Sequence, residues 1–182
     1  MPGITFDRLL DNRQRTPSFR PARTCLLCLD PGETTGVAVF HASKLHACCQ
    51  SNTSHPDLAL NEFTRLFDLY TPTACVIEDY RVYGNRAQYH IGSSLHTPRM
   101  IGIIEALCLQ RGIPYHKQMA GLAKGFVTDA KLRDWGWYAQ AERHSRDAIR
   151  HGAYFILFPP KTMLSEGIQR SDGTKHGGHH VG

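Results

Sequence analysis

Two acidic side chains stand at the ends of short apolar runs in this sequence. Asp30 ends the run at residues 24–30, and Glu78 ends the run at residues 73–78. Apolar runs bounded by proline and glycine are typical of β-strands. An unpaired carboxylate is costly to bury, so a buried strand gains no stability from ending on one. Both acids are therefore candidates for chemistry, although a turn or capping role would explain Asp30 alone equally well.

A third acid lies between two histidines late in the sequence. His144, Asp147 and His151 are spaced i, i+3 and i+7, which places them on one face of a helix predicted at about residues 141–158. An apolar stripe borders this polar row, and such a stripe packs against a sheet. The alternative interpretation of the row is a solvated helix edge.

Three acids and a histidine would form a metal site if the fold brought them together. Gathered carboxylates raise each other's pKa unless a cation neutralises them. An oxygen-rich site with one imidazole suits magnesium or manganese. Two such ions about 4 Å apart support in-line displacement at phosphorus, one activating water and the other stabilising the leaving oxygen. A cluster of Asp30, Glu78, His144 and Asp147 therefore predicts a metal-dependent nuclease.

The elements around the strand acids favour their meeting at one edge of a sheet. We predict strands at 24–30, 36–42 and 45–50, a helix at 56–70 and a strand at 73–78. A strand, a helix and a second strand suggest a right-handed crossover, which would make the first and last of these strands parallel neighbours. Both acids would then emerge at the carboxyl end of the sheet, where open α/β sheets place their sites.

The remaining elements complete an α/β domain at residues 23–160. A helix at 98–111, a strand at 113–117, broken helical pieces at 119–140 and the helix at 141–158 follow in order. The prolines at 159 and 160 end the last helix. These elements predict a mixed five-stranded sheet flanked by helices.

The two ends of the sequence differ in composition from this domain. Five arginines crowd residues 1–23, and we predict that residues 1–22 form a flexible basic arm. Residues 161–182 are rich in glycine and histidine, which predicts a flexible tail. The net charge of +5 permits a polyanionic partner.

The composition argues against membrane and secreted proteins. The sequence has no run of about 18 apolar residues, and its first residues lack the apolar core of a signal peptide. We expect the six cysteines to be reduced thiols rather than metal ligands, as in a cytoplasmic protein.

Basic and aromatic side chains supply candidate contacts to nucleic acid. Such contacts are made mainly to phosphates by lysine and arginine. The candidates come from an irregular segment at 80–97 and from the lysines that follow it: Arg81, Tyr83, Arg86, Lys117, Lys124 and Lys131.

Short motifs in a fixed order resemble the RuvC-like Holliday junction resolvases. They are Leu29-Asp30-Pro31-Gly32 with Thr35-Gly36, then Val76-Ile77-Glu78, then His144-x-x-Asp147-Ala148. The phage members, with Glu78-Asp79-Tyr80 and Asp147-Ala-x-x-His151, look most similar. The resemblance covers about residues 24–158. Each motif is short, and the resemblance is specific because all of them occur in this order.

The resemblance implies an RNase H-like fold, a homodimer, and paired symmetric nicking of four-way DNA junctions in a bacterial or phage-infected host cell. It implies two Mg²⁺ or Mn²⁺ ions per active site, held by residues in the places of the family's catalytic set: Asp30, Glu78, His144 and Asp147. Many members carry aspartate where this sequence has His144. Lys124 and Lys131 fall near basic residues that the family uses on DNA.

Three other interpretations remain open at the level of sequence. A kinase or ATPase of the actin–hexokinase type shares the core of the fold, but it needs two lobes, which 182 residues do not supply. Another RNase H-like nuclease would cut flaps or RNA/DNA hybrids with the same metal site. A catalytically inactive junction-binding module would have no need for the paired acids.

Overall fold

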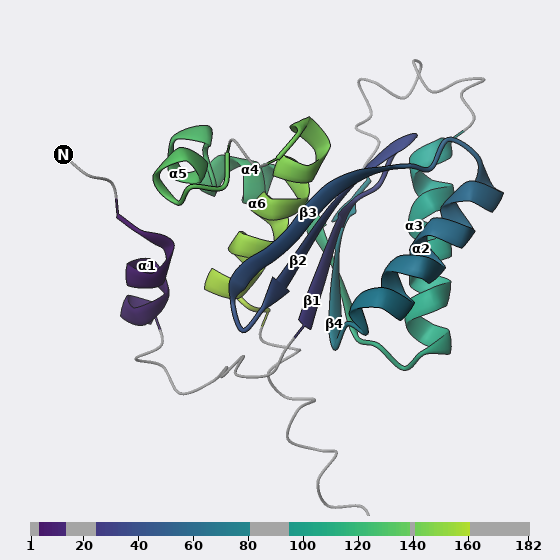
Figure 1. Ribbon diagram of the computed structural model, residues 1–182, viewed down its shortest axis with the longest axis horizontal. Helices are drawn as coiled ribbons and strands as arrows, with labels where there is room; N and C mark the ends of the chain where they lie inside the picture. Colours follow the sequence, from purple (N-terminus) through teal and green to yellow (C-terminus); the bar gives the residue numbers. More distant parts are fainter. Residues whose placement is uncertain (1–3, 14–24, 81–94, 139–140, 161–182) are drawn as a thin grey trace, which may run out of the picture.

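The computed structural model describes residues 4–13, 25–80, 95–138 and 141–160. Five strands form one sheet in the order β3-β2-β1-β4-β5 (Figure 1). The strands are β1 (Cys25–Asp30), β2 (Thr34–His41), β3 (Lys44–Asn52), β4 (Ala74–Asp79) and β5 (Tyr115–Met119). β1, β2 and β3 pair antiparallel, whereas β4 pairs parallel with both β1 and β5. The predicted mixed five-stranded sheet is therefore confirmed.

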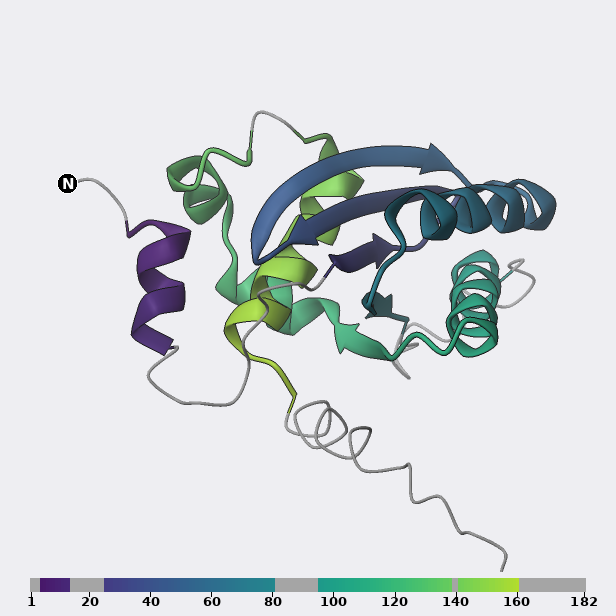
Figure 2. The same ribbon diagram turned by 60° about the horizontal axis from the view of Figure 1, so that its bottom comes forward.

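Six helices accompany the sheet in the described residues. They are α1 (Phe6–Arg13), α2 (Pro56–Tyr70), α3 (His96–Gln110), α4 (Ala120–Phe126), α5 (Asp129–Asp134) and α6 (Arg143–Leu157). α2 and α3 lie on one side of the sheet, and α6 lies on the other (Figure 2). None of the helices in the described ranges is long and apolar enough to cross a membrane.

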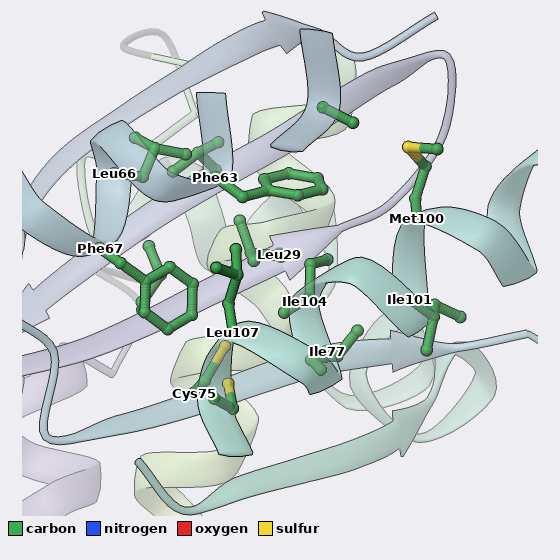
Figure 3. Packing of buried hydrophobic residues seen from close by; sticks show 14 of the residues in the cluster. Leu29, Phe63, Leu66, Phe67, Cys75, Ile77, Met100, Ile101, Ile104 and Leu107 are labelled. Atoms are coloured by element: carbon green, nitrogen blue, oxygen red, sulfur yellow. The ribbon is translucent and has the colours of Figure 1, made fainter. Parts of the chain in front are cut away.

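The period-2 alternation of the strands supplies one apolar layer to each side. Leu29 and Ile77 face α2 and α3, where they pack with Phe63, Ile104 and their neighbours (Figure 3). Cys28 and Val76 face the other way and pack under α6. The two central strands are thus buried on both faces, which fixes their register.

Helix α6 packs against the sheet at unusually close range through two glycines. A Cβ atom at Gly36 of β2 would lie 2.0 Å from the backbone oxygen of His144. A Cβ atom at Gly152 of α6 would lie 2.3 Å from the ring of Phe40. Only glycine fits at these two points, so they set the distance between α6 and β2.

Helix α1 differs from the flexible arm expected over residues 1–22. Phe6 is buried, and its ring lies 5.1 Å from Trp135 and 4.9 Å from Trp137, measured between centroids. The indole nitrogen of Trp135 donates to the carbonyl of Ile4 at 3.1 Å. Apolar residues at 6, 9 and 10 have helical spacing, and this stripe docks the segment despite its basic composition.

Helix α2 has the predicted bounds, with Pro56 in its first turn. Other boundaries differ from the predicted ones by one or two residues. Helix α3 begins at His96, two residues before the predicted start at residue 98. Leu95, which precedes it, has a left-handed backbone conformation. Strand β5 begins at Tyr115, two residues later than predicted, directly after Pro114, which has no backbone N–H to donate to a sheet.

Candidate active site

Two of the predicted acids lie side by side because of the parallel pairing of β1 and β4. Leu29 is the register partner of Ile77, so Asp30 and Glu78 emerge together at the carboxyl end of these strands. The two side chains are mostly buried, with 12% and 18% of their surfaces exposed. Asp147 reaches the same place from α6, and its side chain is 15% exposed.

His144 stands beside Asp30 at the beginning of α6. Its Nδ1 lies 3.2 Å from Asp30 Oδ2, and 41% of its side chain is exposed. The backbone nitrogen of His144 donates to Gln50 Oε1 at 3.0 Å, and the Gln50 amide also donates to Glu142. Gln50 of β3 therefore holds the first turn of α6 where the imidazole can meet Asp30.

Two cationic side chains neutralise the acids in this structure. Lys124 Nζ lies 3.2 Å from Glu78 Oε2 and 3.1 Å from Asp147 Oδ2. On the far side of Asp147, the Arg150 guanidinium donates to its carboxylate and to Asp129. Arg150 also donates to the carbonyl of Val127 at 3.0 Å. Asp147 is thus held between a lysine from α4 and an arginine from its own helix.

His151 lies behind Glu78 and is fully buried. Its Nε2 is 2.9 Å from Glu78 Oε2, and its Nδ1 is 2.9 Å from the side-chain nitrogen of Gln118. Gln118 comes from the edge strand β5, His151 from α6 and Glu78 from β4. The two hydrogen bonds therefore link these three elements at the Glu78 carboxylate.

The two strand acids have opposite pKa shifts. Burial, followed by the charge of Glu78, raises the pKa of Asp30 from 3.8 to about 8. Burial acts in the same direction on Glu78, but the hydrogen bond from His151 and the charge of Lys124 outweigh it and lower the pKa of Glu78 to about 2. Asp30 and Glu78 also share a side-chain hydrogen bond. Together they hold one proton and one negative charge at neutral pH.

The donor set is chemically suited to a hard divalent cation. Three carboxylates and an exposed imidazole are the ligand types that magnesium and manganese prefer. In the described part of the chain, however, no three His, Cys, Asp or Glu side chains converge in an arrangement that could hold a metal ion. The Lys124 ammonium lies between Glu78 and Asp147 and serves as the resident cation there. The residue types therefore suit a divalent metal ion, and in this structure the Lys124 ammonium lies between two of the proposed ligands, Glu78 and Asp147.

The candidate DNA contacts fall in different parts of the molecule. Arg81, Tyr83 and Arg86 lie outside the described residues. Lys117 pairs with Glu105 of α3 at 2.9 Å, and Lys131 donates to the carbonyl of Phe126 at 2.6 Å. Of the three lysines in this set, Lys124 is the one that the structure places at the acids. Contact of the whole set with DNA stays a prediction.

The sequence interpretation missed three residues that support the acids of this site, which are Gln50, Gln118 and Arg150. Gln118 is the fourth residue of a short strand and carries no motif of its own. Arg150 follows Asp147 by three residues, a spacing at which helical side chains meet, so it could have been proposed from the sequence. His151 was noted for its spacing, but its burial behind Glu78 depends on how α6 docks on the sheet.

No protein-family model matches the sequence, and no curated protein matches it either. Solved structures do resemble it. One is described as Thermus thermophilus RuvC in complex with Holliday junction substrate, with a TM-score of 0.57 at 15% identity, covering 75% of this chain and 94% of that one. A second Thermus thermophilus RuvC structure has a TM-score of 0.57 at 12% identity and covers 77% and 97% of the two chains.

The yeast mitochondrial Holliday junction resolvase Ydc2 is also similar. It has a TM-score of 0.52 at 14% identity, covering 88% of this chain and 86% of that one. These likenesses are to a bacterial and a mitochondrial protein, and the predicted similarity to phage members stays a prediction. The sheet order β3-β2-β1-β4-β5, flanked by helices, is the RNase H-like fold that this chain shares with RuvC.

Proposed function

We propose that this protein is a metal-dependent endonuclease that resolves four-way DNA junctions by paired symmetric nicks. The observation that carries the proposal is the meeting of Asp30, Glu78 and Asp147 at the carboxyl edge of an RNase H-like sheet. The same fold occurs in a RuvC structure described as a complex with a Holliday junction substrate. Acids that come from three separate elements and lie near one another at a strand edge are typical of a catalytic site.

The proposed ligands of Mg²⁺ or Mn²⁺ are Asp30, Glu78, His144 and Asp147. Two bound ions would supply an activated water and a stabilised leaving oxygen. The residues of the chain prepare the site for them. His144 faces Asp30 across 3.2 Å and is exposed enough to meet a ligand, while Arg150 orients Asp147. His151 orients Glu78 from the buried side.

The proposed substrate is branched DNA, and the proposed assembly is a homodimer. The net charge of +5 favours a polyanion, and Lys124 places a partly exposed ammonium beside the acids, where a phosphate would approach. Two symmetric cuts require two active sites on one junction, and a two-fold dimer supplies them. We place this activity in the cytoplasm of a bacterial or phage-infected host cell.

The deciding experiment separates cutting from binding. Asp30→Asn, Glu78→Gln and Asp147→Asn each remove one negative charge and keep the shape of the side chain. We expect each variant to lose at least 100-fold in cleavage rate with Mg²⁺ or Mn²⁺, while junction affinity changes by less than about threefold because phosphates are held by Lys and Arg. Asp11→Asn, which changes an exposed acid of α1 away from the site, is the matched control.

The substrates should be a four-way junction, a flap, an RNA/DNA hybrid and a plain duplex. Preferential paired cutting of the junction supports the proposal. Preferential cutting of the flap or hybrid would assign the site to another RNase H-like nuclease, and tight junction binding with no cutting in either metal would leave a binding module. Wild-type rates in any of the three acid variants would remove that residue from the site.

A further inference from the structure

Two buried polar residues, Gln118 and His151, form a hydrogen-bonded chain that ends on Glu78. Gln118 of β5 is 3% exposed and His151 of α6 is fully buried. The Gln118 side-chain nitrogen is 2.9 Å from His151 Nδ1, and His151 Nε2 is 2.9 Å from Glu78 Oε2. Burying an amide and an imidazole is costly unless their hydrogen bonds are made, and here those bonds lead to an acid of the site.

The direction of these hydrogen bonds follows from a second contact of Gln118. The same side-chain nitrogen lies 3.2 Å from the backbone carbonyl oxygen of His151. A carbonyl oxygen only accepts, so this nitrogen is the amino group of the amide, which only donates. It therefore donates to Nδ1 as well, and Nδ1 must accept through its lone pair. The ring proton of the neutral imidazole is left on Nε2, from which it is donated to Glu78.

We infer that Gln118 and His151 are positioning residues for Glu78. Gln118 selects the Nε2–H tautomer of His151, and this tautomer holds Oε2 of Glu78, while Lys124 lies 3.2 Å from Oε2 and 3.3 Å from Oε1. The inference rests on the proposed function in one respect, since it takes Glu78 to be a metal ligand. The second contacts of metal ligands fix their orientation in this way.

A purely structural role would not call for this arrangement. A histidine needed only to fill the core would be replaced at lower cost by an apolar side chain, because α6 is otherwise packed by Ala148, Ile149 and Phe155. The opposite tautomer would turn the Nε2 lone pair toward the Glu78 carboxylate, and two acceptors in contact repel. The amide of Gln118 prevents that state by occupying Nδ1.

The tautomer can be observed directly in the metal-free wild-type protein. Long-range ¹H–¹⁵N correlation spectra of the histidine rings distinguish the Nδ1–H from the Nε2–H form, and the His151 signals are assigned by their absence in His151→Asn. We expect the Nε2–H pattern in the wild type. An Nδ1–H pattern there would overturn the inference, whatever the activity of the protein.

Metal affinity tests the consequence for Glu78. Gln118→Leu removes the donor with little change in volume, and we expect Mn²⁺ affinity, measured by electron paramagnetic resonance of the free ion, to fall by about 10-fold or more. Gln118→Glu keeps a polar group but offers only acceptors, so it should move the ring proton to Nδ1 and weaken Mn²⁺ binding as well. Ser51→Ala, which removes a buried hydrogen bond to Glu62, is the control that should leave Mn²⁺ affinity unchanged.

The outcomes separate this inference from the proposed function. Wild-type Mn²⁺ affinity in a folded Gln118→Leu or Gln118→Glu protein would overturn the inference even if the wild type cuts junctions. Wild type that binds Mn²⁺ with the expected tautomer and cuts no branched DNA would overturn the proposed function and leave the positioning roles standing. If Gln118→Leu fails to fold, the Gln118→Glu protein and the wild-type spectrum decide the matter.

Discussion

Lys124 has two partners at the centre of the site, and both are acids proposed to bind metal. Glu78 and Asp147 are 3.2 and 3.1 Å from its ammonium. Burial alone would lower the pKa of Lys124, but the charges of these two acids raise it, so the ammonium stays charged in the neutral range. A metal ion bound at these proposed ligands would have to displace this cation, so we expect Lys124 to compete with metal.

Substitution of Lys124 by methionine should strengthen metal binding. The side chain is 39% exposed, so solvent screening limits each ion pair to about 1 kcal/mol or less, and Mn²⁺ affinity should rise by about fivefold. The metal-free protein should melt at a lower temperature, because three acids lose a neutralising charge, and added Mn²⁺ should restore more of the melting temperature than in the wild type.

Lys44→Met is the matched control for this substitution. Lys44 is an exposed residue at the β2–β3 turn, and its loss should alter neither the Mn²⁺ affinity nor the response of the melting temperature to metal. Weaker Mn²⁺ binding by Lys124→Met would show that the lysine supports metal binding instead of opposing it.

The raised pKa of Asp30 predicts an unusual dependence of stability on pH. Between about pH 4 and pH 8 the folded, metal-free protein keeps a proton on Asp30 that the unfolded chain releases, so this group's contribution to the free energy of unfolding falls as pH rises. The lowered pKa of Glu78 acts in a different range, since its contribution is lost only as pH falls from about 4.5 toward 2.

Asp30→Asn should remove this fall in the free energy of unfolding with rising pH. Comparing melting temperatures of the metal-free wild type and the variant at pH 5 and pH 8.5, we expect the variant to gain about 2 kcal/mol relative to the wild type at the higher pH, or roughly 4–8 °C. Parallel curves for the two proteins would mean that Asp30 titrates near its ordinary value.

At the scale of elements, the site depends on how closely α6 approaches the sheet. His144 and Asp147 lie on α6, whereas Asp30 and Glu78 lie on β1 and β4. Gly36 of β2 sits opposite the backbone of His144, with no room for a Cβ atom. The absence of a side chain at this one position therefore helps to set the distance between the acids of the helix and those of the strands.

Gly36→Ala should push the first turn of α6 away from the sheet. The added methyl group meets backbone at 2.0 Å, and backbone cannot yield as a flexible side chain does, so we expect a loss of about 1–3 kcal/mol in stability and at least 10-fold in junction cleavage. Gly102→Ala in α3 is the control, because its new Cβ has open space and alanine favours a helix by about 1 kcal/mol. A Gly36→Ala protein with wild-type stability would contradict the close approach.

The sequence predicts the elements better than their mutual contacts. The helix at residues 56–70, the three antiparallel strands and the meeting of Asp30 with Glu78 all follow from local patterns and from the rule for crossovers. The Gln118–His151 contact spans 33 residues and depends on the docking of α6, which local patterns do not specify. The docking of α1 does not follow from its basic composition, because three apolar side chains at helical spacing hold it on the molecule.

At the scale of the whole molecule, α3 is less available for self-association than its apolar content suggests. Met100, Ile104 and Cys108 are buried against the molecule's own sheet. The outward surface near the C-terminal end of α3 carries Leu109, which is 70% exposed, and an ion pair between Arg111 and Asp68 joins this end to α2. We therefore expect the contact of the proposed dimer near the C-terminal ends of α2 and α3, and not along the buried apolar face of α3.

Leu109→Lys should weaken the proposed dimer. A buried charge at a contact has no partner, so we expect the dimer dissociation constant measured by sedimentation equilibrium to rise at least 10-fold, with paired nicking replaced by single nicks. Ile4→Lys changes an exposed apolar residue beside α1 and should leave the dimer intact. A wild-type protein that is monomeric at micromolar concentration and still cuts in pairs would exclude a preformed dimer.

Helix α6 is also made last among the elements that carry the site. Synthesis at about 5–20 residues per second separates Glu78 from Asp147 by roughly 3–14 s. During that interval the growing chain holds the two strand acids without Asp147, His144 or His151. A growing chain without α6 therefore has an incomplete site, and the cleavage proposed for it requires that α6 has left the ribosome and packed on the sheet.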